Sequence, residues 1–322
     1  MILSIENLTT AFYGKTTVLK AVDRLHLTIQ EGESVALVGE SGSGKTVTAL
    51  SILQLLPPAG AIDSGAIYFR DKNLLELSER DMRHVRGKNI GLILQDPLAA
   101  LNPLMRVGEQ IAEVMRYHFG YSKKQAKSET LLLMERVRLE DVERIYAAYP
   151  HELSGGLRQR ALIAVALAAQ PALLIADEPT TALDTTIQSE ILKLLKSLQH
   201  EFQLTLLLIT HDLGVVANIA EKVAVMYAGQ VVECSPTETL FSHPMHPYTE
   251  LLLNSMPQVP WPIRRSPGDF HSKGRNAISG CVFSARCYMA DDQCRHSEPI
   301  NNYIDPTHSV KCIKRGNTSY EQ

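Results

Sequence analysis

At residues 39–46 the chain reads Gly39-Glu40-Ser41-Gly42-Ser43-Gly44-Lys45-Thr46, which fits the pattern G-x-x-x-x-G-K-[ST]. The apolar run at residues 34–38 predicts a buried strand before it, and the apolar spacing of residues 46–56 predicts a helix after it. Glycines in such a segment let backbone N–H groups turn toward a phosphate, and the N-terminus of the helix adds a partial positive charge. In this interpretation Lys45 contacts the β- and γ-phosphates of a nucleotide, and the Thr46 hydroxyl binds Mg²⁺.

The length and charge of the chain narrow the possible classes of protein. A length of 322 residues predicts two domains, and a formal net charge of −3 argues against a general nucleic-acid binder. The first seven residues lack the basic and apolar segments of a signal peptide. The longest apolar run, residues 161–169, is far shorter than the roughly 20 residues that a membrane span needs. We therefore expect a cytosolic protein whose association with a membrane is peripheral.

Buried apolar runs alternate with helical segments up to about residue 235, which favours an α/β fold with a mostly parallel sheet covered on both faces. Strands are predicted at residues 34–38, 64–69, 89–94, 173–178 and 204–209, followed by a hairpin at 223–232. Helices are predicted at residues 74–86 and 187–202, with a helical insert at 107–139. Residues 1–35 predict short strands with a hairpin tip at 12–15. Phe12 and Tyr13 lie at this tip, and spacing alone favours an ordinary aromatic at a sheet edge over one that stacks on a purine.

Two acidic residues, Asp177 and Glu178, end a predicted buried strand. Because ligands of parallel α/β sheets bind at the carboxyl ends of the strands, we expect both acids to face the phosphate loop. Asp177 suits Mg²⁺, directly or through water, since that ion prefers oxygen ligands. Glu178 is placed to orient or deprotonate a water molecule that attacks a γ-phosphate. A second glycine-rich turn, at residues 153–156, opens another predicted helix and can also bind an anion.

With these motifs in this order, the chain resembles the ATP-binding-cassette (ABC) ATPases, the nucleotide-binding subunits of membrane transporters. Residues 39–46 are similar to the Walker A loop, Gln95 to the Q-loop glutamine, residues 153–156 to the signature motif, residues 173–178 to Walker B, Ala182-Leu183-Asp184 to the D-loop and His211 to the switch histidine. Phe12 or Tyr13 matches the adenine-stacking aromatic of the family, which reverses the preference from spacing. Leu157 stands where the signature motif usually ends in Gln. The resemblance covers residues 1 to about 235.

The resemblance implies a P-loop NTPase cassette with a mostly parallel sheet, an antiparallel β subdomain and a helical subdomain at about residues 96–165. It also implies a head-to-tail dimer with a second copy or a paralogue, with two ATP molecules held between the subunits. Each ATP would contact the Walker motifs of one subunit and Ser154-Gly155-Gly156 of the other. Gln95 would reach Mg²⁺ and the attacking water, and His211 would contact the γ-phosphate. On this basis catalysis is assigned to Glu178, His211 and Gln95, Mg²⁺ to Thr46, Gln95 and Asp177, and further nucleotide contacts to Asp184 and the aromatic residues.

The sequence changes in character near residue 235, where prolines become frequent and the alternation ends, so we expect a cassette at residues 1–235 and an extension at 236–322. His246-Pro247-Tyr248-Thr249 resembles the extension of the oligopeptide and dipeptide importer ATPases, and Cys281, Cys287, Cys294 and Cys312 resemble the cysteine cluster of that sub-branch. Cys234 is expected to be a separate thiol. We expect a structural or regulatory role for this cysteine cluster rather than a catalytic one, because nothing in the sequence places it near the phosphates.

Three kinds of chemistry could use the four extension cysteines. Disulfides are disfavoured in the cytosol. Zinc sites usually contain close C-x₂₋₄-C pairs, which are absent here, whereas a 4Fe–4S cluster accepts four thiolates at irregular spacing. The residues alone leave structural Zn and 4Fe–4S equal, and the resemblance favours 4Fe–4S. Ala285 stands where the family usually has Pro.

The resemblance thus predicts the ATPase subunit of a bacterial importer of di- or oligopeptides at the cytoplasmic face of the inner membrane. Its partners would be two transmembrane permease subunits and, through them, an extracytoplasmic solute-binding protein. An importer of nickel, a metallophore or glutathione uses the same sub-branch and remains an alternative. A soluble ABC ATPase of DNA repair or translation would share the nucleotide motifs but would lack this extension.

Overall fold

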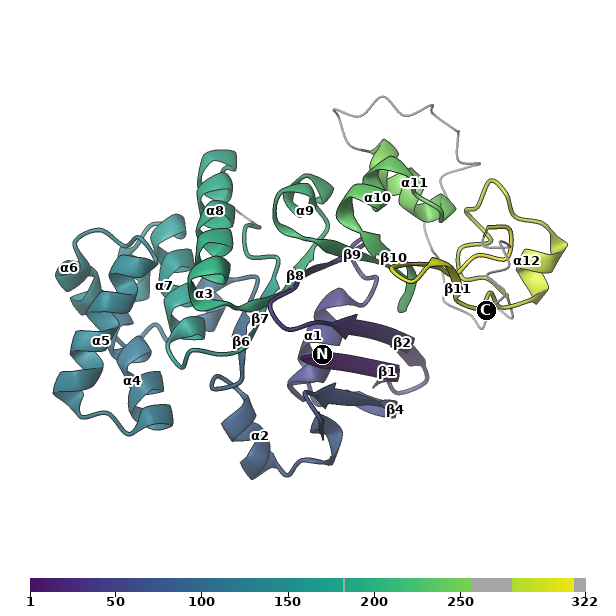
Figure 1. Cartoon of the computed structure of the whole chain (residues 1–322). Coiled ribbons are helices and arrows are strands. Elements are labelled where there is room, and N and C mark those ends of the chain that lie inside the picture. The colour runs from purple at the N-terminus through teal and green to yellow at the C-terminus, as the bar shows by residue number, and fades with distance from the viewer. Residues whose placement is uncertain (182, 256–279, 316–322) are drawn as a thin grey trace. The chain divides into compact units, whose positions relative to one another are not determined.

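The computed structural model describes residues 1–181, 183–255 and 280–315 (Figure 1). The chain forms two compact units that interleave along the sequence. Unit 1 comprises Met1–Ile2, Ile29–Ser34 and Asp71–Ile209, and unit 2 comprises Leu3–Thr28, Val35–Arg70 and Thr210–Gln322.

Unit 1 contains a parallel sheet in which β7 (Leu173–Asp177) lies between β8 (Thr205–Thr210) and β6 (Ile90–Ile93). Leu173 of β7 lies opposite Ile90 on one side and Thr205 on the other. All residues of β7 and β8 are buried, which explains why their sequences are continuously apolar rather than alternating. The strands predicted at residues 89–94, 173–178 and 204–209 are confirmed in this arrangement.

The helices of unit 1 are α2 (Glu79–Val85), α3 (Pro97–Ala100), α4 (Val107–Phe119), α5 (Lys123–Arg136), α6 (Val142–Ala147), α7 (Gly155–Leu167) and α8 (Thr185–Phe202). Short elements complete it: β5 (Lys72–Asn73), η1 (Leu74–Glu76) and η2 (Pro150–Glu152). Helices α4 and α5 form the predicted helical insert, and Gly120 separates them in a left-handed backbone conformation with φ of 69°. The continuous helix predicted at 74–86 is wrong, because Ser78 accepts a hydrogen bond from Asp81 N and starts a new helix, α2.

Unit 2 contains an antiparallel sheet in the order β2-β1-β4, made of β1 (Leu3–Tyr13), β2 (Val18–Ile29) and β4 (Gly60–Phe69). Leu3 lies opposite Phe69, and Phe12 lies opposite Gly60. The predicted hairpin tip is confirmed by a turn in which Gly14 N donates to Thr17 O at 2.9 Å. The flanking strands span 11 and 12 residues, so the prediction of short strands is wrong.

The second sheet of unit 2 has the order β11-β12-β10-β9-β3, with β3 (Ser34–Val38), β9 (Lys222–Tyr227), β10 (Gln230–Pro236), β11 (Asn302–Asp305) and β12 (His308–Val310). β3 and β9 are parallel, whereas β9, β10, β12 and β11 pair antiparallel, which confirms the predicted hairpin at 223–232. Strands β11 and β12 continue the sheet beyond β10. The domain boundary near residue 235 therefore lies at the end of a sheet strand, and it stays a prediction.

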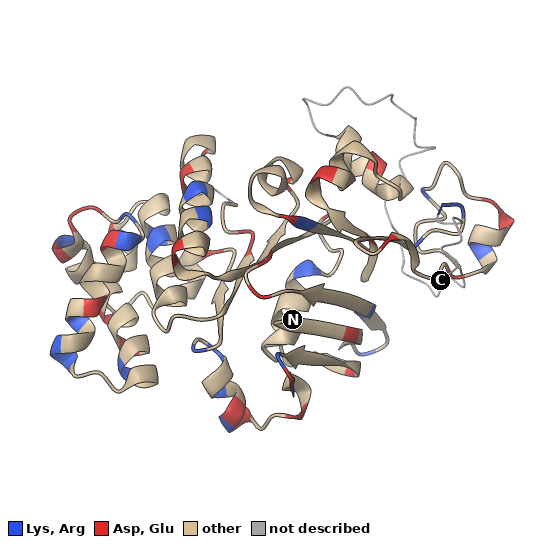
Figure 2. Cartoon of the chain, in the orientation of Figure 1, with Lys and Arg blue, Asp and Glu red and all other residues tan. Residues whose placement is uncertain are grey.

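The helices of unit 2 are α1 (Lys45–Ile52), α9 (Leu213–Ile219), α10 (Thr237–Ser242), α11 (Pro247–Asn254) and α12 (Asp292–His296). Helix α1 ends earlier than the predicted residue 56, because Gln54 takes a left-handed backbone conformation with φ of 51°. In the described ranges, no helix has both the length and the apolar character that a bilayer span requires. Figure 2 shows Lys and Arg interspersed with Asp and Glu along α5 and α8.

A buried polar network holds the extension onto β10. The Glu233 carboxylate, which is 1% exposed, accepts hydrogen bonds from Met245 N at 2.7 Å, His246 N at 2.8 Å and His308 Nε2 at 2.9 Å. His246 in turn begins α11, where its Nδ1 accepts from Tyr248 N at 3.0 Å. Burial lowers the pKa of His246 to about 4, opposed by the charge of Glu233 and aided by that of Arg315.

This buried imidazole predicts a specific dependence of stability on pH. Because its pKa falls from 6.5 in the unfolded chain to about 4 in the folded one, the unfolded state binds the extra proton between these values. The stabilisation is complete above about pH 6.5 and is lost as the pH falls toward about 4. Each pH unit in this window should cost up to about 1.4 kcal/mol of unfolding free energy from this group.

The variant His246→Asn keeps a side-chain acceptor at the start of α11 and removes the titrating ring. Urea denaturation between pH 6.5 and 4.5 should show a flatter pH dependence for His246→Asn than for the wild type, while the exposed His243→Asn keeps the wild-type slope. Equal slopes for His246→Asn and the wild type would contradict the buried neutral imidazole.

Candidate functional site

Neighbouring strands of unit 2 restrict the backbone of the phosphate loop at residues 39–46. Gly39 and Gly44 have φ of 157° and 112°, and a Cβ on either would overlap a backbone carbonyl oxygen, that of Met226 for Gly39 and that of Ala21 for Gly44. Only glycine fits such close approaches. Strands β2 and β9, which supply these carbonyls, therefore shape the loop.

The loop ends at the N-terminus of α1, where the cap residue Gly44 offers no side chain to the first N–H groups. These groups and the helix dipole favour an anion at this point. The buried Lys45 ammonium donates to Gly39 O at 2.7 Å and to Glu40 O at 3.1 Å, so the cation lies over the loop's own carbonyls. Thr46 is exposed, and the buried Ser43 Oγ has no hydrogen-bond partner among the described residues.

The extension contacts this loop directly at Glu40, through residues other than the four cysteines. Arg286 Nη1 and Nη2 donate to the two Glu40 carboxylate oxygens at 2.8 and 2.9 Å. Glu40 N donates to Tyr248 Oη at 2.9 Å. Tyr248 lies in the stretch at residues 246–249 noted above, and Arg286 directly precedes Cys287, but no local pattern linked either residue to residue 40.

In unit 1, the two catalytic candidates Glu178 and Gln95 are in contact. Gln95 Nε2 donates to Glu178 Oε2 at 3.1 Å, and Thr181 Oγ1 donates to the same oxygen at 2.8 Å. Glu178 has φ of 46°, and its N–H donates to Ile209 O at 2.8 Å. A left-handed conformation is costly for a residue with a side chain, and such conformations are concentrated at functional sites. Thr181 is a contact that the sequence analysis missed, although it lies three residues after Glu178.

The remaining candidates of unit 1 lie at strand and helix ends. Asp177 is buried at the end of β7. Ser154 begins α7, where its Oγ accepts from Leu157 N at 3.4 Å, and both Ser154 and Gly155 are exposed. Asp184 begins α8, where its Oδ1 accepts from Ile187 N at 3.0 Å. Of the predicted D-loop, Ala182 lies outside the described residues.

The remaining candidates of unit 2 are exposed or half-buried. His211 is exposed and directly precedes Asp212, the residue that caps α9. Phe12 is half-buried against Gly60, where a Cβ would meet its ring at 3.0 Å. The exposed Tyr13 donates its hydroxyl to Asp63 Oδ1 at 2.6 Å.

The extension cysteines are all free thiols. Cys281 N donates to Cys294 O at 2.8 Å, which joins the segment around residue 281 to α12. Burial raises the pKa of Cys281 to about 11, and the charges of Cys312, Cys287 and Cys294 act in the same direction. In the part of the chain that the structure describes, no group of three or more His, Cys, Asp or Glu side chains has the geometry of a metal site.

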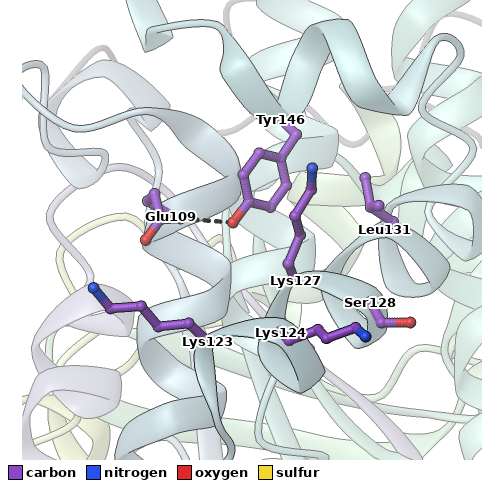
Figure 3. Close-up of a pocket in the computed structure, with 7 residues that line it drawn as sticks. All are labelled: Glu109, Lys123, Lys124, Lys127, Ser128, Leu131 and Tyr146. Atoms are coloured by element: carbon purple, nitrogen blue, oxygen red, sulfur yellow. Dashed lines mark hydrogen bonds between the residues drawn. The ribbon is translucent and has the colours of Figure 1, made fainter.

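A pocket of about 480 Å³ lies in the helical insert, away from the predicted motifs in the sequence (Figure 3). Its lining residues are Glu109, Lys123, Lys124, Lys127, Ser128, Leu131 and Tyr146. Tyr146 Oη donates to Glu109 Oε1 at 2.7 Å, and Lys127 Nζ lies 5.3 Å from the centre of the Tyr146 ring. None of the residues assigned to nucleotide or metal lines this pocket.

Comparison with protein families gives two matches, one in the predicted cassette and one near the carboxyl end of the chain. The family described as "ABC transporter" matches residues 22–181, and the family described as "Oligopeptide/dipeptide transporter, C-terminal region" matches residues 232–294. The second match includes Tyr248 and Arg286, the two residues that contact the phosphate loop.

Relatives along the full length give the same result. The chain is 46% identical over 321 residues to a probable peptide ABC transporter ATP-binding protein of Sinorhizobium fredii, with 97% of this chain and 94% of that protein covered. It is 46% identical over 315 residues to the oligopeptide transport ATP-binding protein AppD of Bacillus subtilis, with 97% and 96% covered.

Solved structures of ABC cassettes share the fold. A dimeric, post-hydrolysis state of the ATP-binding cassette MJ0796 bound to ADP and Pi matches with a TM-score of 0.67 at 28% identity, over 73% of this chain and 99% of the other. The protein cbiO1 of Clostridium perfringens, part of the ABC transporter complex cbiONQ, matches with a TM-score of 0.64 at 27% identity, over 75% and 91%.

These matches confirm the predicted cassette fold, with its antiparallel subdomain and cysteine-containing carboxyl-terminal region, and the predicted class of ATP-hydrolysing ABC ATPases. The chain therefore belongs to the ABC transporter ATP-binding proteins of the oligopeptide/dipeptide import family.

Proposed function

We propose that this chain binds ATP at residues 39–46 and hydrolyses it to drive the uptake of di- or oligopeptides through partner subunits. The observation that carries the proposal is the phosphate loop, whose backbone is shaped by the close approach of two strand carbonyls and which ends in a helix N-terminus that no side chain caps. The peptide-transport descriptions of the full-length relatives support peptides as the solute.

In the proposed binding mode, backbone N–H groups of the loop contact the phosphates, and Lys45 exchanges its loop carbonyls for the β- and γ-phosphates. Mg²⁺ would be held by the Thr46 hydroxyl, Asp177 and Gln95, since oxygen ligands suit this ion. Phe12 or Tyr13 would stack on the adenine. The bond of Tyr13 to Asp63 restrains that ring at the surface and supports such a platform.

In the proposed hydrolysis step, Glu178 accepts a proton from water as the water oxygen bonds to the γ-phosphorus. The bond from that phosphorus to the β–γ bridging oxygen breaks, and ADP is the leaving group. Gln95 donates to one oxygen of Glu178, so it orients the carboxylate and the water together. His211 would contact the γ-phosphate and stabilise the charge that develops there.

We propose that the active form is a head-to-tail dimer of ATPase subunits. Ser154-Gly155-Gly156 would contact the ATP of the other subunit, and Asp184 would lie near the same interface. The exposure of Ser154 and Gly155 at the start of α7 supports this assignment, because a helix N-terminus at the surface is available to an anion from outside.

The proposed partners are two transmembrane permease subunits, which would hold this chain at the cytoplasmic face of the membrane, and a solute-binding protein on the other side. A nickel, metallophore or glutathione importer of the same sub-branch is the second candidate. Assays of ATP hydrolysis by the reconstituted importer with each solute would distinguish the two, because only the cognate solute should stimulate hydrolysis.

The exchange Glu178→Gln removes the proposed base and keeps the size of the side chain. It should lower the rate of ATP hydrolysis at least about 10²-fold and leave the dissociation constant for ATP within about twofold of the wild type. Steady-state phosphate release and equilibrium ATP binding measure the two quantities. The matched control is Glu129→Gln on the exposed face of α5, which should change neither. Hydrolysis at the wild-type rate by Glu178→Gln would refute the role of base.

We also propose that residues 1–235 and 236–322 are the cassette and the extension, and that the extension cysteines hold one 4Fe–4S cluster, with structural Zn as the alternative. The four extension cysteines are free thiols, and four thiolates are the donor set that such a cluster needs. Since the described side chains do not form a metal site as they stand, the thiols would have to reorient on binding.

Iron, sulfide and zinc analysis of anaerobically purified protein tests this assignment. The wild type should contain about four irons and four sulfides per chain. Cys281→Ser should lose this metal, while Cys234→Ser, on β10, should retain it. A wild type with one zinc and no iron would replace the cluster by a zinc site, and equal metal content in Cys281→Ser would remove this cysteine from either site.

A further inference from the structure

The strongest link between the extension and the nucleotide motifs is the paired contact of Arg286 with Glu40. Both guanidinium nitrogens engage both carboxylate oxygens, at 2.8 and 2.9 Å, in the bidentate geometry that gives ion pairs their greatest directional preference. The Arg286 and Glu40 side chains are 21% and 42% exposed, so water screens the pair only in part. The pair joins positions 246 residues apart.

The Arg286 side chain is itself held in place. Its backbone N–H donates to Phe283 O at 3.0 Å within a tight turn, and Phe283 is 1% exposed. The guanidinium carbon lies 5.7 Å from the centre of the Tyr227 ring and 5.8 Å from that of the Phe283 ring. Such contacts with aromatic rings favour a cation and restrict its orientation. Arg286 therefore presents a fixed fork to Glu40.

Tyr248 restrains the same residue through its backbone. The Tyr248 ring is fully buried, with its centre 4.6 Å from that of Tyr227 and 5.5 Å from that of Phe283. Its hydroxyl accepts the Glu40 N–H at 2.9 Å. The extension thus holds both the side chain and the backbone of Glu40, which is the second residue of the phosphate loop.

Glu40 brings a negative charge into a loop that is built for an anion. A carboxylate near a triphosphate repels it, and the repulsion grows with the charge of the nucleotide. Arg286 offsets this charge by pairing with it. In the proposed binding mode, the loop would present N–H groups and Lys45 to the phosphates while the Glu40 carboxylate is paired with Arg286.

We propose that Arg286 and Tyr248 are positioning residues for the phosphate loop, and that Arg286 also neutralises Glu40 so that the loop accepts ATP. The extension then contributes to nucleotide affinity through an ion pair, whether or not its cysteines bind a metal. This inference rests on the proposed binding of ATP at residues 39–46.

The test measures dissociation constants for ATP and ADP by titration calorimetry on the full chain in the Glu178→Gln background. Arg286→Ala should weaken ATP binding about three- to tenfold, and ADP binding less, because it leaves an unpaired carboxylate near the phosphates. Adding Glu40→Gln to Arg286→Ala should restore ATP affinity to within about twofold of the value for Glu40→Gln alone. A residue that merely stabilised the extension would show neither the preference between nucleotides nor the rescue.

Tyr248→Phe is a second, independent variant, because it keeps the buried ring and removes only the acceptor for Glu40 N–H. It should weaken ATP and ADP binding about equally, by roughly two- to fivefold. The matched control is Arg24→Ala, since Arg24 also forms a two-pronged pair, at 2.6 and 2.8 Å, with an extension carboxylate, that of Glu298. Arg24→Ala should keep the dissociation constants for ATP and ADP that the Glu178→Gln protein has.

The outcomes separate this inference from the proposed function. Failure of the Glu178→Gln protein itself to bind ATP would contradict the proposed function. Normal ATP affinity in both Arg286→Ala and Tyr248→Phe, or failure of Glu40→Gln to rescue Arg286→Ala, would contradict the inference and leave ATP binding in place.

Discussion

The close approach of two backbone carbonyls to the phosphate loop is the constraint on which the account of unit 2 depends. The carbonyl oxygens of Ala21 and Met226 occupy the space that side chains would need at Gly44 and Gly39. The loop consequently cannot relax into an ordinary turn, and its N–H groups stay available at the start of α1. At Gly42 a Cβ would meet nothing within 4 Å, so packing does not require a glycine there. Its left-handed backbone conformation, with φ of 79°, does favour glycine.

In unit 1, the backbone and side chain of Glu178 are constrained in a comparable way. Its left-handed backbone is fixed by the hydrogen bond to Ile209 O on the neighbouring strand β8, and its carboxylate by Gln95 and Thr181. A reacting group held from several sides loses little entropy when substrate arrives, which favours catalysis. In both units, therefore, the residues that carry the motifs are oriented by regular strands, and the proposed chemistry is placed at the ends of those strands.

Much of this could be predicted from the sequence, because the information is local. The glycine-rich loop, the two acids after β7 and the helix start at Ser154 are each short patterns with a direct physical meaning. The break of the predicted helix at Ser78 could have been found from its cap, since Ser followed three residues later by Asp is a helix-start signal. The contact of Arg286 with Glu40 could not be predicted, because nothing in either local pattern specifies a pairing across 246 positions.

The most direct test of the central claim, that backbone N–H groups of residues 39–46 hold the phosphates, is hydrogen–deuterium exchange of the wild-type chain with and without ATP and Mg²⁺. The account predicts that saturating ATP slows exchange in the peptide containing Gly42 to Thr46, while the peptide from α5 at residues 123–136 is unchanged. Unchanged exchange in the loop peptide at saturating ATP would contradict it.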